Sequence, residues 1–205
     1  MSSTTCPAYQ LGGCSDTCAV MPLSFEDAME HDLAETLITA EQLHARNAEL
    51  AATIHADYEG KPLTVVIISN GALIFASDLV RHLPIPLQLD VIAAKSYVGA
   101  RSSGEVTIRN PLHVPVKDRH VLVVDDIFDS GLTLETICEN VASLQPVSIK
   151  TCVLLCKNRP RTTSTLPDYV GFPIDDQFVV GYGLDYEECY RNLPYIGVLH
   201  PHLYQ

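Results

Sequence analysis

A cluster of polar side chains follows a strongly apolar run in the middle of the 205-residue sequence. The apolar run covers residues 121–124, and the polar residues after it are Asp125, Asp126, Asp129, Ser130, Gly131 and Thr133. Residues 132–144 are typical of a helix, so the backbone N–H groups of residues 129–133 would point into the turn before it. Such a turn is suited to binding a phosphate group.

Carboxylates next to a phosphate site are explained by a ligand whose hydroxyls lie beside its phosphate. Asp125 and Asp126 would accept hydrogen bonds from the vicinal hydroxyls of a phosphorylated ribose. The hydroxyls of Ser130 and Thr133 add donors, and Gly131 lets the backbone approach the phosphate closely. The alternative is an ordinary strand-to-helix turn with an aspartate N-cap, which accounts for one acid but not for three.

Two other phosphate-binding motifs are excluded by the sequence. Gly60 and Lys61 are followed by Pro62, so the nucleotide-triphosphate loop is missing. Gly181 and Gly183 lack the third glycine of a dinucleotide fingerprint.

Strands and helices alternate around this cluster. The strands expected from apolar runs are residues 63–68, 87–94, 121–124, 149–156 and 178–180, and the helices are 24–58, 72–83 and 132–144, with a second helix starting at Thr39. Residues 97–107 are expected to form a mobile loop. This order predicts an α/β fold with a mainly parallel sheet flanked by helices. Ligands of such sheets bind beyond the carboxyl ends of the strands, where this chain has polar residues at 69–71, 95–97, 125–126, 157–159 and 181–185.

Composition limits the class of protein. The net charge is −12, which argues against nonspecific binding to nucleic acid or to an anionic membrane. No apolar run is long enough to span a bilayer, and the first 45 residues contain no Lys or Arg, unlike a secretory signal. We expect a loose extension over residues 1–21, one domain over 22–205, and a cytoplasmic location.

The seven cysteines favour the same reducing compartment. Cys138, Cys152, Cys156 and Cys189 lie in apolar or mixed segments and are expected to be buried thiols. The spacing of Cys6, Cys14 and Cys18 is eight and four, which is not typical of a structural zinc site.

The run from Val121 to Leu134 resembles the phosphoribosyl-pyrophosphate motif of type I phosphoribosyltransferases. Further segments narrow the resemblance to the hypoxanthine-guanine phosphoribosyltransferase family; in chain order they are residues 95–97, 103–106, Lys157, 167–172, 178–186 and 190–195. The match covers residues 24–199. It implies a parallel sheet flanked by helices, with a small hood lobe formed by the chain ends.

The resemblance also implies a role for each matched residue. Asp129 would be the general base or acid near the purine N7, while Asp125 and Asp126 hold the ribose hydroxyls and lie near metal. The 5′-phosphate would be held by Ser130, Gly131, Leu132 and Thr133; the purine by Lys157, Phe178 and Val179; pyrophosphate by Asn70, Gly71 and Arg191; Mg²⁺ by Asp185; and Ser96 and Tyr97 begin a lid. In this family the peptide bond of the 69–71 loop is a non-proline cis bond.

The reaction implied is purine base plus phosphoribosyl pyrophosphate giving a nucleoside monophosphate and pyrophosphate, with Mg²⁺ and in a homodimer or homotetramer. The partners implied are phosphoribosyl pyrophosphate and a 6-oxopurine, with no nucleic acid and no membrane. Asn70 is a departure, because the family often has Lys or Arg there. Outside the motif, Phe178 would simply be a core residue, Lys157 a solvated charge, and Arg191 half of a surface pair with Glu187 or Glu188.

The alternatives to this reaction are a regulator that kept the site but lost turnover, and an enzyme for another base. Adenine fits Lys157 poorly, because both groups donate hydrogen bonds. Xanthine, and the ranking of hypoxanthine against guanine, stay open.

Overall fold

The computed structural model describes residues 31–96, 106–159, 163 and 166–204. These residues form two compact units. One unit contains the described residues up to Ala40 together with those from Phe178 onward, and the other runs from Glu41 to Gln177. The described residues nearest the two ends of the chain therefore share one unit, as the resemblance implies.

The unit from Glu41 to Gln177 is built on a six-stranded sheet in the order β4-β3-β2-β5-β6-β7. Its strands are β2 (Leu63–Ser69), β3 (Leu87–Ser96), β4 (Val106–Ile108), β5 (His120–Phe128), β6 (Ser148–Lys157) and β7 (Tyr169–Ile174). All neighbours are parallel except β4, which pairs antiparallel with β3. The predicted α/β class with a mainly parallel sheet is thus confirmed, and the parallel part consists of five strands, β3, β2, β5, β6 and β7.

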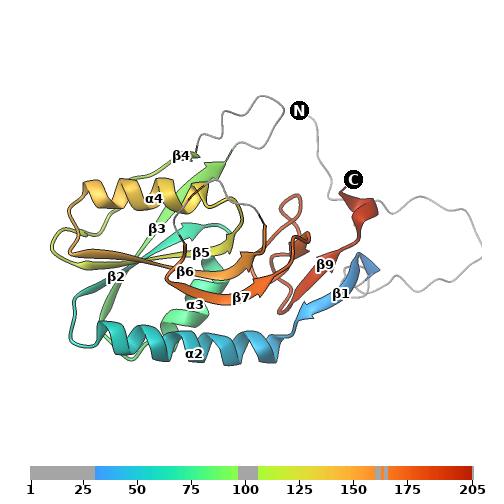
Figure 1. Ribbon diagram of the computed structural model, residues 1–205, viewed down its shortest axis with the longest axis horizontal. Coiled ribbons are helices and arrows are strands. Elements are labelled where there is room, and N and C mark those ends of the chain that lie inside the picture. Colours follow the sequence, from blue (N-terminus) through green and yellow to red (C-terminus); the bar gives the residue numbers. More distant parts are fainter. Residues whose placement is uncertain (1–30, 97–105, 160–162, 164–165, 205) are drawn as a thin grey trace, which may run out of the picture. The chain divides into compact units, whose positions relative to one another are not determined.

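Three helices flank this sheet: α2 (Ala40–Tyr58), α3 (Leu73–Arg81) and α4 (Leu132–Ser143). Helix α4 lies on one face of the sheet, and α2 and α3 lie on the opposite face (Figure 1). Strand β2 is buried on both faces because every residue from Leu63 to Ile68 is apolar except Thr64. The hydroxyl oxygen of Thr64 accepts a hydrogen bond of 2.7 Å from Nε of Arg119.

The sheet register aligns the polar ends of the strands. Ile67 pairs with Val124 in the β2–β5 ladder, so Ser69 and Asp126, two residues further along, are level with each other. Phe128 pairs with Cys156 in the β5–β6 ladder. Asp129 and Lys157, the residues that follow this pair, therefore lie next to each other at the ends of neighbouring strands.

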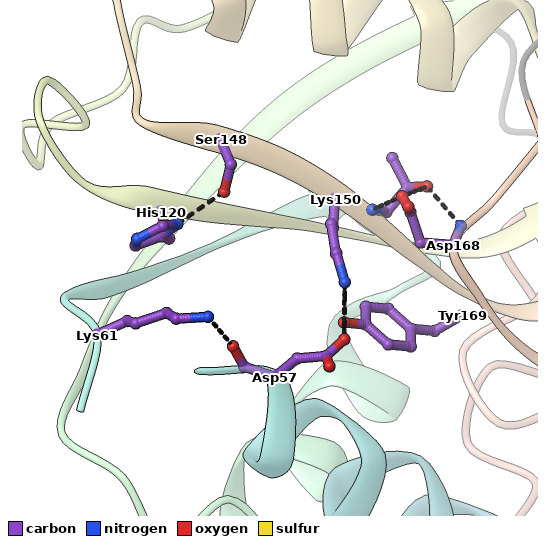
Figure 2. Close-up of polar contacts among 8 residues, drawn as sticks. Asp57, Lys61, His120, Ser148, Lys150, Asp168 and Tyr169 are labelled. Atoms are coloured by element: carbon purple, nitrogen blue, oxygen red, sulfur yellow. Dashed lines mark hydrogen bonds and ion pairs between the residues drawn. The ribbon is translucent and has the colours of Figure 1, made fainter. Parts of the chain in front are cut away.

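The opposite edge of the sheet, where the strands begin, is tied to the end of α2. Figure 2 shows Lys150 of β6 and Tyr169 of β7 converging on the carboxylate of Asp57. Oδ2 of Asp57 lies 2.7 Å from Nζ of Lys150 and 2.5 Å from the hydroxyl of Tyr169. These hydrogen bonds, led by the one from Lys150, lower the pKa of Asp57. Earlier in α2, Nε of Arg46 donates a 2.7 Å hydrogen bond to the carbonyl of Gly171.

The other unit contains a three-stranded antiparallel sheet in the order β1-β9-β8. Its strands are β1 (Leu33–Ile38), β8 (Val179–Val180) and β9 (Ile196–Leu199), and a 3₁₀ turn, η2 (Pro201–Leu203), follows. The small core of this unit is made of Val180, Tyr190, Leu193 and Leu199, with Phe178, Tyr186, Leu203 and Tyr204 packed against it.

Three expectations about elements were wrong. Residues 33–38 form strand β1 rather than helix, because they pair with β9. Residues 179–180 belong to the antiparallel sheet, so β7 takes the fifth place in the parallel sheet. Residues 106 and 107, expected in a loop, begin strand β4.

Cys138, Cys152 and Cys156 are free thiols as expected, but only Cys152 is fully buried, whereas Cys138 and Cys156 are half-buried. Desolvation raises the pKa of Cys138 to about 11. Cys189 is disulfide-bonded, so the expectation of a thiol at this position was wrong. Among the residues that the structure describes, no helix is long and apolar enough to cross a membrane. The expected extension over residues 1–21 lies outside the described residues.

Candidate active site

The turn between β5 and α4 carries the polar cluster found in the sequence. Strand β5 continues through Asp125 and Asp126 to Phe128, and α4 begins at Leu132. Gly131, the residue before the helix, has φ +86°, and a Cβ at this position would overlap the ring of Phe128. A glycine is therefore required here for two reasons, its backbone conformation and its tight packing.

Asp125 and Asp126 begin the site. Asp125 is only 7% exposed, and burial together with the neighbouring charge of Asp126 raises the pKa of Asp125 well above its usual value. One oxygen of Asp126 accepts a 2.8 Å hydrogen bond from the backbone N–H of Ile127. Two adjacent carboxylates of this kind are stabilised by a ligand that supplies hydroxyl donors or a cation.

The loop after β2 lies against this pair. A Cβ on Gly71 would overlap Oδ2 of Asp126, so the backbone of the loop reaches the carboxylate directly. The Ser69–Asn70 peptide bond is cis, as the resemblance implies. The structure thus brings the expected pyrophosphate loop and the expected ribose-binding carboxylates together.

Asp129, the expected general base, directly follows the last residue of β5. Its Oδ1 is shielded from solvent and lies 2.9 Å from Nη1 of Arg159, without forming a well-aligned hydrogen bond. The pair is an ion pair with both side chains about 40% exposed. Arg159 thus holds one oxygen of the Asp129 carboxylate, and a carboxylate has a second oxygen for another partner.

Lys157, the residue expected to contact the base, leaves the end of β6 beside Asp129. Its side chain is 13% exposed, so it is not a solvated surface charge. Nζ of Lys157 donates a 3.1 Å hydrogen bond to Oδ1 of Asp176, and this oxygen lies 3.6 Å from Nη1 of Arg159. The ammonium of Lys157 lowers the pKa of Asp176. Asp129, Arg159, Asp176 and Lys157 therefore form one chain of alternating charges.

The remaining expected residues lie in the unit formed by the chain ends. Phe178 is half-buried and its ring stacks on Tyr204, while Val179 is buried in the β8–β9 pair opposite Val198. Backbone hydrogen bonds then close the loop after β8: the N–H of Tyr182 donates to the carbonyl of Leu193, and the N–H of Gly183 donates to the carbonyl of Arg191.

The loop closed by these hydrogen bonds places Arg191 beside Asp185. Nη2 of Arg191 lies 2.9 Å from Oδ1 of Asp185 and 3.0 Å from Oε2 of Glu188. Its Nη1 donates a 2.8 Å hydrogen bond to the carbonyl of Gly183. The simple alternative of a surface pair with Glu188 is thus present, but Arg191 also holds the residue expected to bind metal.

Comparisons with known proteins identify the family of this chain. Residues 36–187 match the phosphoribosyl transferase domain family. A hypoxanthine-guanine phosphoribosyltransferase of Mycobacterium avium is 41% identical over 194 residues, which cover 91% of this chain and 96% of the relative. The corresponding protein of Staphylococcus aureus strain Mu50 is 42% identical over 177 residues, covering 86% and 99%.

A solved structure agrees as well. The tetragonal crystal structure of a Staphylococcus aureus hypoxanthine phosphoribosyltransferase has a TM-score of 0.84 and 41% identity, and the match covers 88% of this chain and 99% of that one. The chain belongs to the phosphoribosyl transferase domain family.

Within this phosphoribosyltransferase, the residues expected to form the site fall into two groups. The Glu41–Gln177 unit carries Asn70, Gly71, Asp125, Asp126, Asp129, Ser130, Gly131, Leu132, Thr133 and Lys157, and the other unit carries Phe178, Val179, Asp185 and Arg191. Ser96 is the last residue of β3, whereas Tyr97 lies outside the described residues. No group of three or more His, Cys, Asp or Glu side chains in the described part of the chain is arranged to hold a metal ion.

Sequence reasoning missed three residues of this phosphoribosyltransferase that contact expected site residues. Arg159 contacts Asp129, Asp176 contacts Lys157, and Tyr204 stacks on Phe178. The sequence drew attention to Arg159, because residues 157–159 follow a predicted strand. Its contact with Asp129, however, depends on the register between β5 and β6. Nothing in the local sequence around Tyr204 indicates its partner.

Proposed function

We propose that this phosphoribosyltransferase transfers the 5-phosphoribosyl group from phosphoribosyl pyrophosphate to hypoxanthine, and also to guanine, in purine salvage. The products are IMP or GMP and pyrophosphate. The observation that carries the proposal is the position of Asp129 and Lys157 on neighbouring strands. They directly follow Phe128 of β5 and Cys156 of β6, which pair with each other. A carboxylate and an ammonium at this spacing suit a base that offers an N–H and a carbonyl oxygen on one edge.

The proposed reaction exchanges one bond at the anomeric carbon for another. The bond from C1′ to the pyrophosphate oxygen breaks, and a bond from C1′ to the purine nitrogen forms. Positive charge builds up on the ribose during this exchange, and the carboxylates of Asp125 and Asp126 favour it. Arg191 offsets the negative charge that the leaving pyrophosphate gains.

Asp129 is assigned the proton transfer to or from the base, through the carboxylate oxygen that Arg159 does not contact. Lys157 donates to the exocyclic oxygen of the 6-oxopurine, and Phe178 stacks on the ring. Lys157 reaches the base by leaving Asp176, an exposed partner whose ion pair contributes little free energy.

The carboxylates suit Mg²⁺, which the family resemblance implies. Mg²⁺ is usually bound by one or two carboxylates together with substrate phosphates, and Asp125, Asp126 and Asp185 provide such oxygens. Burial, and then the neighbouring charge of Asp126, raises the pKa of Asp125, so a cation beside this pair would be favourable. When bound, Mg²⁺ would neutralise charge on the pyrophosphate.

Cellular setting and assembly are part of the same proposal. We place the enzyme in the cytoplasm, as a homodimer or homotetramer that binds phosphoribosyl pyrophosphate and a 6-oxopurine, and that contacts neither nucleic acid nor membrane. The net charge of −12 supports the absence of nucleic acid.

A turnover assay tests the proposal. The purified protein is given phosphoribosyl pyrophosphate and Mg²⁺ with hypoxanthine, guanine, xanthine or adenine in separate reactions, and the monophosphate product is measured. We expect product with hypoxanthine and guanine, none with adenine, and none after chelation of Mg²⁺. The variant Asp129→Asn should lower kcat by about a hundredfold, the contribution of general acid–base catalysis.

Two results would count against the proposal. Turnover of xanthine or adenine in preference to hypoxanthine would show that the enzyme acts on a different base from the one proposed. Absence of product with every base, together with measurable binding of phosphoribosyl pyrophosphate, would indicate a regulator that kept the site without turnover.

A further inference from the structure

The ring of Phe178 has one face covered by the carboxyl end of the chain. Its centroid lies 4.7 Å from that of Tyr204 and the two rings are inclined by only 23°, so they are stacked. Phe178 is nevertheless only half-buried, so part of its surface is still accessible. A phenyl ring has two faces, and Tyr204 occupies one of them.

The position of Tyr204 is fixed by neighbouring contacts in the same unit. The ring of Tyr186 is nearly perpendicular to that of Phe178, with their centroids 5.5 Å apart and an angle of 87° between the planes. The hydroxyl of Tyr186 donates a 2.8 Å hydrogen bond to the carbonyl of Leu203. The N–H of Tyr204 bonds to the carbonyl of Pro201, which closes the 3₁₀ turn η2.

The backbone of Phe178 is held by the segment that leads into this turn. Its carbonyl accepts a 2.9 Å hydrogen bond from the N–H of Leu199, the last residue of β9. Phe178 is therefore connected to residues 199–204 by its backbone, through the perpendicular ring of Tyr186, and by the ring face that stacks on Tyr204.

We propose that Tyr204 is a positioning residue for the purine base. It supports one face of the Phe178 ring, so the base stacks on the opposite face and completes a stack of three rings. This inference rests on the proposed function, because Phe178 contacts the base only in that reaction. Tyr204 itself does not contact the base.

The physical reason is preorganisation. Phe178 directly precedes the short strand β8. A phenyl ring without support rotates about its side-chain torsions, and binding a base to one face must then restrict that rotation. Offset stacking on Tyr204 holds the ring in place before the base arrives, and aromatic pairs of this geometry are favourable beyond the area they bury. The expected effect falls on binding of the base rather than on the chemical step.

Two substitutions at the same position give the test and its control. Tyr204→Ala removes the supporting ring, whereas Tyr204→Phe keeps the ring and removes only the hydroxyl. We expect Tyr204→Ala to raise the KM for hypoxanthine by about two- to tenfold, while kcat and the KM for phosphoribosyl pyrophosphate change less than about twofold. Tyr204→Phe should behave like the wild type.

A third variant tests the connection through Tyr186. Tyr186→Phe keeps the edge contact with Phe178 but removes the hydrogen bond to Leu203. We expect a smaller rise in the KM for hypoxanthine, in the same direction. If thermal unfolding shows that Tyr204→Ala does not fold, the KM for hypoxanthine is measured in Tyr186→Phe and Tyr204→Leu instead.

The outcomes separate this inference from the proposed function. An unchanged KM for hypoxanthine in a folded, active Tyr204→Ala would overturn the inference alone. A lower KM would also overturn it, because it would mean that Tyr204 covers the face that the base needs. Equal rises in both KM values would indicate a merely structural role.

If the wild type shows no turnover, the proposed function fails, and calorimetric binding of IMP still tests Tyr204. Tyr204→Ala should then bind IMP about two- to tenfold more weakly than Tyr204→Phe does, while the affinity for phosphoribosyl pyrophosphate stays the same. Equal IMP binding by the two variants would overturn the inference.

Discussion

At the scale of single residues, Gly71 and Asp126 leave no space for an added atom. The backbone of Gly71 lies so close to the Asp126 carboxylate that a Cβ would overlap it. The carboxylate is short, and its other oxygen accepts a hydrogen bond from Ile127, so it has little freedom to move away. The position of Asp126 therefore depends on the absence of a side chain at residue 71.

We predict that Gly71→Ala displaces the Asp126 carboxylate and weakens binding of phosphoribosyl pyrophosphate by at least tenfold. The measurement is the KM for phosphoribosyl pyrophosphate, with calorimetry as a direct check. Gly60→Ala is the matched control, because a Cβ there meets nothing within 4 Å although φ is +72°. It should cost about 1–2 kcal/mol of stability and leave the KM unchanged. Equal KM values for the two variants would contradict the prediction.

Arg159 is the second residue whose effect is testable. It places a positive charge 2.9 Å from the Asp129 carboxylate, in a pair that solvent partly screens. Arg159→Met removes the charge and keeps the length of the side chain, and we expect kcat/KM for hypoxanthine to fall about three- to tenfold, consistent with a contribution of about 1 kcal/mol.

The control for Arg159→Met is Arg81→Met, which removes an exposed arginine that pairs with Asp78 at the end of α3. Its kcat/KM should equal that of the wild type. If Arg81→Met and Arg159→Met reduce kcat/KM alike, the loss reflects overall charge rather than the contact with Asp129.

At the scale of elements, helix α2 is attached to the sheet by Asp57. We predict that Asp57→Asn lowers the free energy of unfolding by less than about 1 kcal/mol at pH 7, because the carboxylate is partly exposed. The pKa of Asp57 is lowered in the folded protein, so the stabilisation is present above the unfolded pKa, near 3.9, and is lost as the pH falls through the lower folded value.

Urea unfolding of the wild type and Asp57→Asn at a series of pH values measures this. The difference between them should be constant from pH 5 to pH 7 and shrink below about pH 4. A difference that grows on acidification would show that another group is responsible.

The elements also show what the sequence predicts well and what it does not. Strand β5 and the turn after it were predicted because a continuous apolar run meets polar residues, a signal contained within residues 121–134. Strand β1 was predicted as helix because its partner β9 is far away in the chain. Pairing with a distant strand overrides local propensity.

The same distinction holds in the candidate site. Asp125, Asp126 and Gly131 are recognisable because they follow one another in a motif. The contact between Arg159 and Asp129 depends on the register of β5 and β6, and the stack of Tyr204 on Phe178 depends on the path of the chain after β9. Single-residue types and spacings do not contain that information.

At the scale of the whole molecule, the net charge of −12 opposes compactness. Added salt screens this repulsion, so we predict that raising NaCl from about 10 mM to about 150 mM at pH 7 increases Tm, as measured by calorimetry. The same change near pH 5, close to the sequence pI of 4.9, should have a much smaller effect. A larger effect near pH 5 than at pH 7 would contradict self-repulsion as the cause.

The pairing of β1 with β9 has a consequence for the timing of biosynthesis. Leu33 pairs with Leu199, so a nascent β1 must wait for a partner that the ribosome adds 166 positions later (199 − 33). At about 5–20 residues per second this takes roughly 10–30 s, and all strands of the parallel sheet are synthesised within this interval. A polypeptide released early at any point before residue 178 would lack Phe178, Asp185 and Arg191 altogether. With the roles proposed for these residues, incomplete translation products would be inactive, and activity would appear only after residue 191 has been added to the chain.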